Sequence, residues 1–139
     1  KRRDEATQAF VRLVDYGLAN RQLALKFLFR PGSAQFITEG QISGPYPLWL
    51  NQIARRTVEN RTCLEIVGHT SRSGDEPTKQ RLSVQRAQAI KDRLAGAEPQ
   101  LGKRTLASGV GSRDNLVGTG TDDAGDALDR RVEFRVRDC

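Results

Sequence analysis

The chain has 139 residues, of which 37% are hydrophobic and 29% charged, a composition typical of one folded domain rather than of a disordered segment. The net charge of +6 suggests an anionic partner, but aromatic residues make up only 6% and basic residues alternate with acidic ones, which argues against a nucleic-acid-binding surface. No apolar run reaches the roughly 18–20 residues that span a bilayer, so we expect membrane contact only through a segment upstream of this chain.

The first half of the chain contains two helical patterns and one strand pattern. Residues 4–16 place apolar side chains on one helical face, and Gly17 stands where a C-terminal cap belongs, so we expect the helix to end there. Bulky apolar residues at every second position predict a strand over residues 23–29, ended by Pro31 and Gly32. Pro47 is well placed to open a second helix, with a buried stripe of Leu50, Ile53, Ala54 and Val58.

The second half continues the alternation of strands and helices. Residues 63–67 are almost entirely apolar and predict a central strand, followed by a polar loop over residues 68–78. Ser83 is a candidate N-cap for a third helix, with Ala87, Ile90 and Leu94 on its buried side. Strands over 106–110 and 132–136 complete an α-β-α-β-α-β-loop-β order, which predicts an α/β (α+β) two-layer sandwich. We divide the chain into an N-terminal helix and lead-in over residues 1–22 and a domain over residues 23–139.

Several short motifs share an order and a spacing that resemble a known family. Together with Phe27-Leu28-Phe29 and Ser33-Ala34, they are Gly68-His69-Thr70-Ser71, Leu82-Ser83, Arg86-Ala87, Gly109-Val110-Gly111 and Asp129-Arg130-Arg131-Val132-Glu133. Over residues 27–136 the chain resembles the OmpA-like C-terminal domain, which binds peptidoglycan. The resemblance implies a βαβαβ-β domain with one mixed four-stranded sheet packed by helices. It also implies a non-enzymatic, periplasmic module, anchored to the outer or inner membrane through an upstream segment, with no cofactor.

The resemblance also implies a binding site for the diaminopimelate of the peptidoglycan stem peptide. In typical members an Asp after the Thr holds the ammonium group, and an Arg fifteen positions later holds a carboxylate; Arg86 matches that arginine. A guanidinium and a carboxylate are together well suited to a small zwitterion. We expect Thr70 and Ser71 to supply hydrogen bonds and the Gly32-Ser33 turn to form part of the rim. Substitution of Arg86 by alanine is expected to abolish binding and leave the fold intact.

Two residues depart from the family pattern at this site. Ser71 replaces the Asp, and Lys79 replaces an Asn near the expected ammonium position. We count Lys79 among the residues of the ligand site, where its charge would repel an ammonium group. Three hypotheses follow. Another carboxylate compensates, the pocket binds the ligand mainly through the ligand's carboxylate, or the domain has lost wall binding and docks onto envelope protein partners. We expect Tyr46 and Trp49 to be core or helix-anchoring residues, and a protein-contact surface formed by them is the alternative. The candidate compensating acids are Asp75, Asp122, Asp123 and Asp126.

The remaining reactive residues fit structural roles better than catalytic ones. Cys63 and Cys139 are a candidate disulfide, and unlinked thiols are the alternative. His69 is the only histidine, without a triad pattern around it, so we predict no catalysis. The acids of residues 118–129 do not have the spacing of a calcium loop. We expect them to cap a helix or to pair with Arg130 or Arg131, and we expect no metal site.

Overall fold

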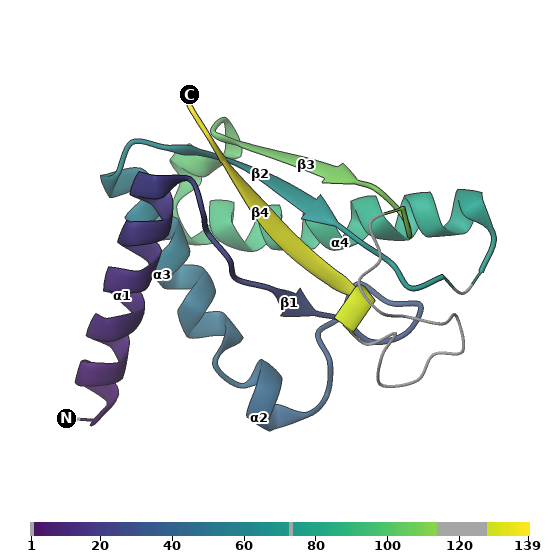
Figure 1. Cartoon of the computed structure of the whole chain (residues 1–139), viewed down its shortest axis with the longest axis horizontal. Coiled ribbons are helices and arrows are strands. Elements are labelled where there is room, and N and C mark those ends of the chain that lie inside the picture. Colours follow the sequence, from purple (N-terminus) through teal and green to yellow (C-terminus); the bar gives the residue numbers. More distant parts are fainter. Residues whose placement is uncertain (1, 73, 114–127) are drawn as a thin grey trace.

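The computed structural model describes residues 2–72, 74–113 and 128–139, in which one sheet packs against helices (Figure 1). The order of elements agrees with the predicted alternation, with a short helix and one turn of 3-10 helix added. In chain order the elements are α1 (Arg2–Asn20), β1 (Phe27–Leu28), α2 (Gly40–Ser43), α3 (Tyr46–Glu59), β2 (Cys63–Gly68), α4 (Glu76–Ala97), η1 (Pro99–Gly102), β3 (Thr105–Gly109) and β4 (Arg131–Arg137).

The sheet is mixed and four-stranded, in the order β1-β4-β2-β3. β2 pairs in parallel with β3, with Ile66 opposite Ala107, and antiparallel with β4, with Ile66 opposite Phe134. β2 therefore has a neighbour on each side, as its apolar sequence predicts. The predicted fold class, a mixed four-stranded sheet packed by helices, is confirmed.

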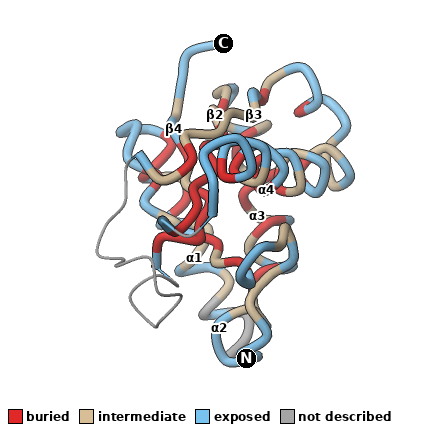
Figure 2. Tube along the Cα trace, turned by 90° about the vertical axis from the view of Figure 1, so that its right-hand side faces the viewer, coloured by how far each residue is buried: buried red, intermediate tan, exposed pale blue. Residues whose placement is uncertain are grey.

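One face of the sheet and the helices enclose the core, which appears as the buried red segments in Figure 2. Successive residues of a strand point to opposite faces, so Leu64, Ile66 and Phe134 face inward and are buried. The opposite face is polar, because Glu65 accepts a hydrogen bond from Ser108 at 3.0 Å and lies 3.7 Å from Arg135. The fold thus has two layers, with a polar outer face on the sheet.

The end of α1 differs from the prediction. The helix passes through Gly17 and continues to Asn20, and the positive φ of 57° falls on Arg21. The amide of Gln22 donates to the oxygen of Gly17 at 2.8 Å, the closing bond of a Schellman motif. Gly17 has a packing role instead, because a Cβ there would lie 3.1 Å from the Cα of Leu23.

Two further predicted boundaries are wrong. The first strand is only two residues long, although the alternation of buried side chains over residues 23–29 holds. Ser83 does not cap α4 but lies inside it, and the cap is Asp75, whose carboxylate accepts from the amide of Thr78 at 3.1 Å. The predicted inward side of the helix, Ala87, Ile90 and Leu94, is fully buried.

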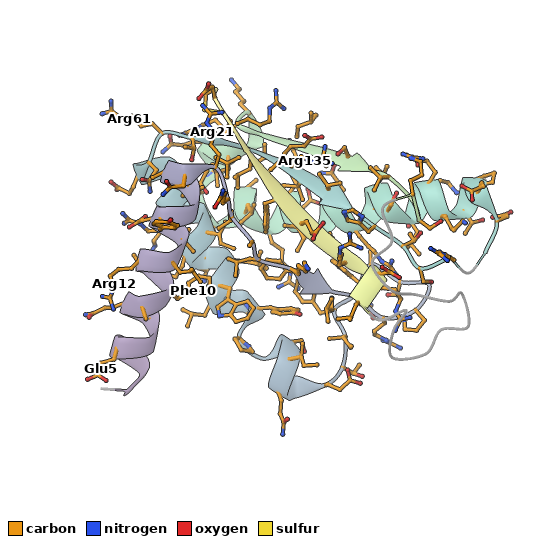
Figure 3. The ribbon with its side chains drawn as sticks, viewed as in Figure 1. Glu5, Phe10, Arg12, Arg21, Arg61 and Arg135 are labelled. Carbon is orange, nitrogen blue, oxygen red and sulfur yellow. A yellow bond between two sulfur atoms is a disulfide. The ribbon has the colours of Figure 1, made fainter. Side chains whose placement is uncertain are left out.

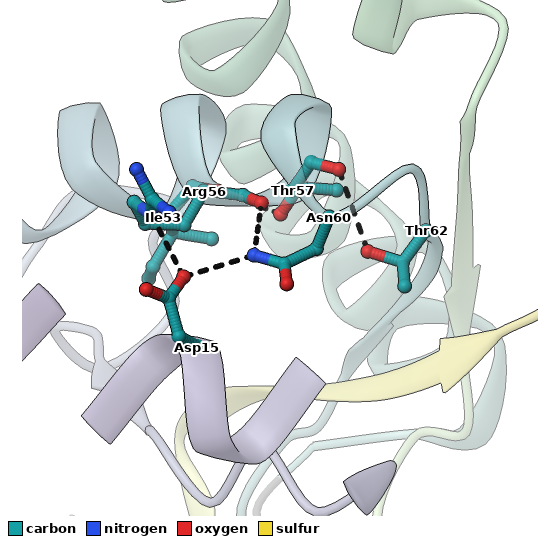
Figure 4. A network of polar contacts seen from close by, with 6 residues as sticks. All are labelled: Asp15, Ile53, Arg56, Thr57, Asn60 and Thr62. Carbon is teal, nitrogen blue, oxygen red and sulfur yellow. Dashed lines mark hydrogen bonds and ion pairs between the residues drawn. The ribbon is translucent and has the colours of Figure 1, made fainter. Parts of the chain in front are cut away.

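α1 is attached to α3 by polar and aromatic contacts. Asp15 accepts hydrogen bonds from Arg56 at 2.7 Å and Asn60 at 2.9 Å (Figure 4). Phe10 stacks on Trp49 with 5.5 Å between ring centroids.

Tyr46 is 2% exposed, and its hydroxyl accepts a hydrogen bond from the amide of Leu28 at 3.1 Å. The hypothesis of a partner surface formed by Tyr46 and Trp49 is therefore wrong for Tyr46, which belongs to the core.

The predicted disulfide between Cys63 and Cys139 is present, with Cα atoms 5.1 Å apart. It joins the first residue of β2 to the last residue of the chain, across a sequence separation of 76 residues. By the loop-entropy model a closure of that length stabilises the fold by about 4–5 kcal/mol. The bond fastens the end that follows β4 to the centre of the sheet.

Candidate functional site

A cavity of about 220 Å³ lies where three segments meet: the turn after β1, the loop after β2 and the first turns of α4. Five of the six ligand-binding residues predicted from the sequence line it, and the sixth, Ser33, contributes a backbone oxygen to a lining side chain. The lining residues are Gly32, Thr70, Ser71, Gly74, Thr78, Lys79, Leu82 and Arg86.

The rim formed by Gly32 and Ser33 is a tight turn. Gly32 has a φ of 62°, which glycine adopts without steric cost, and the amide of Ser33 donates to the oxygen of Arg30 at 3.2 Å. The Ser33 hydroxyl accepts from the amide of Gln35 at 2.9 Å. The turn is therefore fixed by its own hydrogen bonds beside the cavity.

Arg86 connects the three segments around the cavity. It is 0% exposed, and its Nε donates to the oxygen of Ser33 at 2.8 Å. Its two terminal nitrogens donate to the oxygens of His69 and Arg30, each at 2.9 Å. A guanidinium buried in this way holds the site together, so we now expect its removal to destabilise the fold, contrary to the expectation from the sequence. Contact between Arg86 and a ligand remains a prediction.

Lys79 has a carboxylate partner that sequence reasoning missed. Its Nζ lies 2.7 Å from Glu76 and 3.0 Å from the hydroxyl of Ser112, and the lysine is buried. The spacing of Glu76 and Lys79, three residues apart in one helix, is the signal that could have found the pair. The ion pair offsets the lysine charge that we expected to repel an ammonium group.

The predicted compensating acids do not line the cavity in the described part of the chain. Asp75 is exposed and caps α4, and hydrogen bonds from Thr78 hold the pKa of its carboxyl below the usual value. Asp122, Asp123 and Asp126 lie outside the described residues. Thr70 and Ser71 are buried at the end of β2, where the amide of Thr70 donates to the oxygen of Gly111 at 2.8 Å.

Two glycines let α4 approach the strands closely enough to form the cavity. A Cβ at Gly68 would lie 1.7 Å from the backbone oxygen of Ser83, and one at Gly109 would lie 2.6 Å from the amide nitrogen of Val84. The hydroxyl of Ser83 accepts from the amide of Gly111 at 3.1 Å. The close approach at Gly109 explains the first glycine of the Gly109-Val110-Gly111 motif.

A buried ionic cluster precedes and begins β4. Arg131 lies 3.6 Å from Asp129 and 3.3 Å from Glu133, and His69 lies 3.3 Å from Glu133. The predicted pairing of Asp129 with an arginine is confirmed for Arg131. Burial raises the pKa of Glu133, but the hydrogen bond from Arg131 and the nearby charges of Arg131, His69 and Lys26 keep this pKa below its usual value.

Known proteins match both the sequence and this geometry. The sequence profile of the OmpA family matches residues 28–127, well over half of the chain. The chain belongs to the OmpA family. No protein with a curated description matches it. Within the described residues of this OmpA-like domain, no helix is long and apolar enough to cross a membrane.

Solved structures share the fold. The peptidoglycan-associated lipoprotein of Burkholderia pseudomallei is 22% identical with a TM-score of 0.67, over 83% of this chain and 92% of that chain. The C-terminal domain of Helicobacter pylori MotB is 17% identical with a TM-score of 0.65, over 83% and 85%. A putative MotB-like protein of Desulfovibrio vulgaris is 19% identical with a TM-score of 0.60, over 97% and 96%. At these identities the likeness establishes a common architecture.

Proposed function

We propose that this OmpA-like domain binds peptidoglycan without catalysing a reaction on it, and that the 220 Å³ cavity holds the diaminopimelate of the stem peptide. The supporting observation is that Gly32, Thr70, Ser71, Lys79 and Arg86, from three separate segments, line one cavity. The name of one structural neighbour, a peptidoglycan-associated lipoprotein, agrees with the proposal.

The charge of the cavity favours the carboxylate end of the ligand. Lys79 and Arg86 are cationic, and none of the eight lining residues carries a carboxylate. Because Glu76 already pairs with Lys79, a carboxylate meets mainly the positive charge of Arg86. Among the lining side chains, an ammonium group meets only the hydroxyls of Thr70, Ser71 and Thr78. A missing charge pair at about 4 Å costs about 1–4 kcal/mol, depending on the local dielectric. We expect weaker binding of the free zwitterion than an Asp in place of Ser71 would give.

Co-sedimentation with purified sacculi, with free meso-diaminopimelate as competitor, tests the proposal. We expect retention that the free amino acid reverses. Thr78→Trp would fill the cavity from an exposed lining position and should abolish retention, whereas Gln85→Trp, at an exposed position on α4 that does not line it, should not. No retention of the wild-type chain would sink the proposal and direct the search to envelope protein partners.

We place the domain in the periplasm, attached to the outer or inner membrane through an upstream segment. The disulfide between Cys63 and Cys139 supports this placement, because such bonds persist in oxidising compartments. The upstream segment would attach the parent protein to a membrane, and this domain would bind the cell wall. Together the two attachments would anchor the parent protein.

A further inference from the structure

The edge of β4 opens into a second cleft, whose lining residues differ from those of the ligand cavity. β1 pairs with β4 only at Phe27 and Leu28, opposite Val132 and Arg131. The same register would place Leu25 opposite Phe134 and Leu23 opposite Val136. Instead residues 21–26 leave the sheet, and a cleft of about 530 Å³ separates them from β4.

The hydrogen-bonding pattern shows which backbone groups face this cleft. His69 donates its amide to the oxygen of Arg131 at 2.8 Å, so the odd-numbered residues of β4 bond to β2. Phe29 donates to the oxygen of Arg130 at 2.8 Å, so the even-numbered residues face β1. Phe134 and Val136 therefore direct their amides and carbonyls into the cleft, and no described residue forms a backbone hydrogen bond with them there.

Cationic side chains outnumber carboxylates among the residues that line the cleft, beside an apolar wall. Arg21, Lys26 and Arg135 line it with one carboxylate, Glu133, and Leu23 and Leu25 contribute apolar side chains. Figure 3 shows Arg21 at the end of α1 and Arg135 on β4. The three cations pair with Asp138, Glu133 and Glu65, but their side chains are 46–58% exposed. Exposed pairs of this kind are weak, so a partner carboxylate can replace them.

We propose that the open edge of β4 binds an extended acidic segment of another protein by strand addition. An unpaired strand edge is a ready-made surface for an added strand, and the main-chain bonds supply affinity. Acidic side chains on the added strand meet the three cations. A second copy of this domain would bring the same positive charge to the edge and is disfavoured for that reason.

Amide hydrogen exchange, followed by NMR on the isotopically labelled chain, tests whether the edge is open. We expect the amides of Phe134 and Val136 to exchange at least tenfold faster than those of Glu133 and Arg135, which bond to β2. Equal protection of all four amides would mean that the edge is already paired, and would overturn the proposal.

A peptide probe tests the occupant. A capped peptide that alternates valine and glutamate should slow exchange at Phe134 and Val136, and its valine–lysine counterpart should bind at least tenfold more weakly. Val136→Pro removes the amide that faces the cleft and spares the bonds to β2, so it should abolish this binding. Arg135→Glu, which keeps the backbone unchanged, should weaken it at least tenfold if the proline variant does not fold.

Three outcomes of the peptide experiment would count against strand addition: no binding of the acidic peptide, binding that leaves the two amides unprotected, and binding that survives both substitutions. Retention on sacculi should be unaffected by either substitution, because neither residue lines the ligand cavity. The two sites are thereby tested separately.

Discussion

Arg86 donates a hydrogen bond from Nη1 to the backbone oxygen of His69 at 2.9 Å, which ties α4 to the end of β2. Two further bonds from the same guanidinium reach the turn after β1. The arginine that the family pattern assigns to the ligand therefore also supports the cavity, so its loss has two consequences.

Arg86→Ala should destabilise the domain by about 3–5 kcal/mol, because it leaves buried carbonyl oxygens without their donor. Arg81→Ala, on the same helix but exposed, should change the free energy of unfolding by less than about 0.5 kcal/mol. Urea unfolding monitored by circular dichroism measures both. Equal stability of the two variants would mean that the three hydrogen bonds contribute little.

Ser71→Asp should raise the affinity for meso-diaminopimelate at least tenfold, because it restores an anion for the ammonium group. Ser71→Asn is the matched control, with nearly the same shape and no charge. Isothermal titration calorimetry compares the two. If both variants bind like the wild type, the ammonium group lies elsewhere in the cavity.

Asp15 should make the attachment of α1 to α3 dependent on pH. Burial raises the pKa of Asp15, but the hydrogen bonds from Arg56 and Asn60 outweigh it and leave this pKa below its usual value. The stabilisation is therefore present at neutral pH and is lost as pH falls below about 4, through the lowered pKa.

Asp15→Asn measures this contribution. The pair is about one-third exposed, so the substitution should cost only about 0.5–1 kcal/mol at pH 7, and progressively less as pH falls through the lowered pKa of Asp15. Thermal unfolding of both proteins across this pH range gives the difference. A cost that persists at low pH would indicate a packing effect rather than an ionic one.

Gly68→Ala should disrupt the contact between β2 and α4, because the new Cβ would overlap the backbone oxygen of Ser83. We expect a loss of about 3 kcal/mol or more, at the upper end of overpacking costs. Gly96→Ala, on α4 with open space around it, should stabilise the domain by about 0.5–1 kcal/mol. Calorimetric melting temperatures should move in opposite directions.

Periodicity predicted the elements well and their ends poorly. The alternation of apolar residues over 23–29 records which side chains are buried, and this burial continues where the chain has left the sheet. The alternation therefore predicted a strand longer than the two residues of β1. Asp75, with Pro77 in the first turn, carried a better cap signal than Ser83. Nothing in the local sequence shows that Arg21 rather than Gly17 adopts the positive φ.

The site was predictable as a set of residues but not as a set of contacts. Motif spacing brought Gly32, Thr70, Ser71, Lys79 and Arg86 to one cavity. The partners of Arg86 are backbone oxygens, which no sequence pattern names. The pair of Lys79 and Glu76 was readable from helical spacing, whereas the contact with Ser112 depends on tertiary packing.

The bond between Cys63 and Cys139 encloses most of the cavity in a covalent ring. Thr70, Ser71, Lys79 and Arg86 all lie between the two cysteines in sequence. A single proteolytic cut at any peptide bond between them would therefore leave both fragments joined. Because β2 and β4 would stay in one molecule, a nicked domain could re-form its sheet without the entropic cost of reassociating two chains.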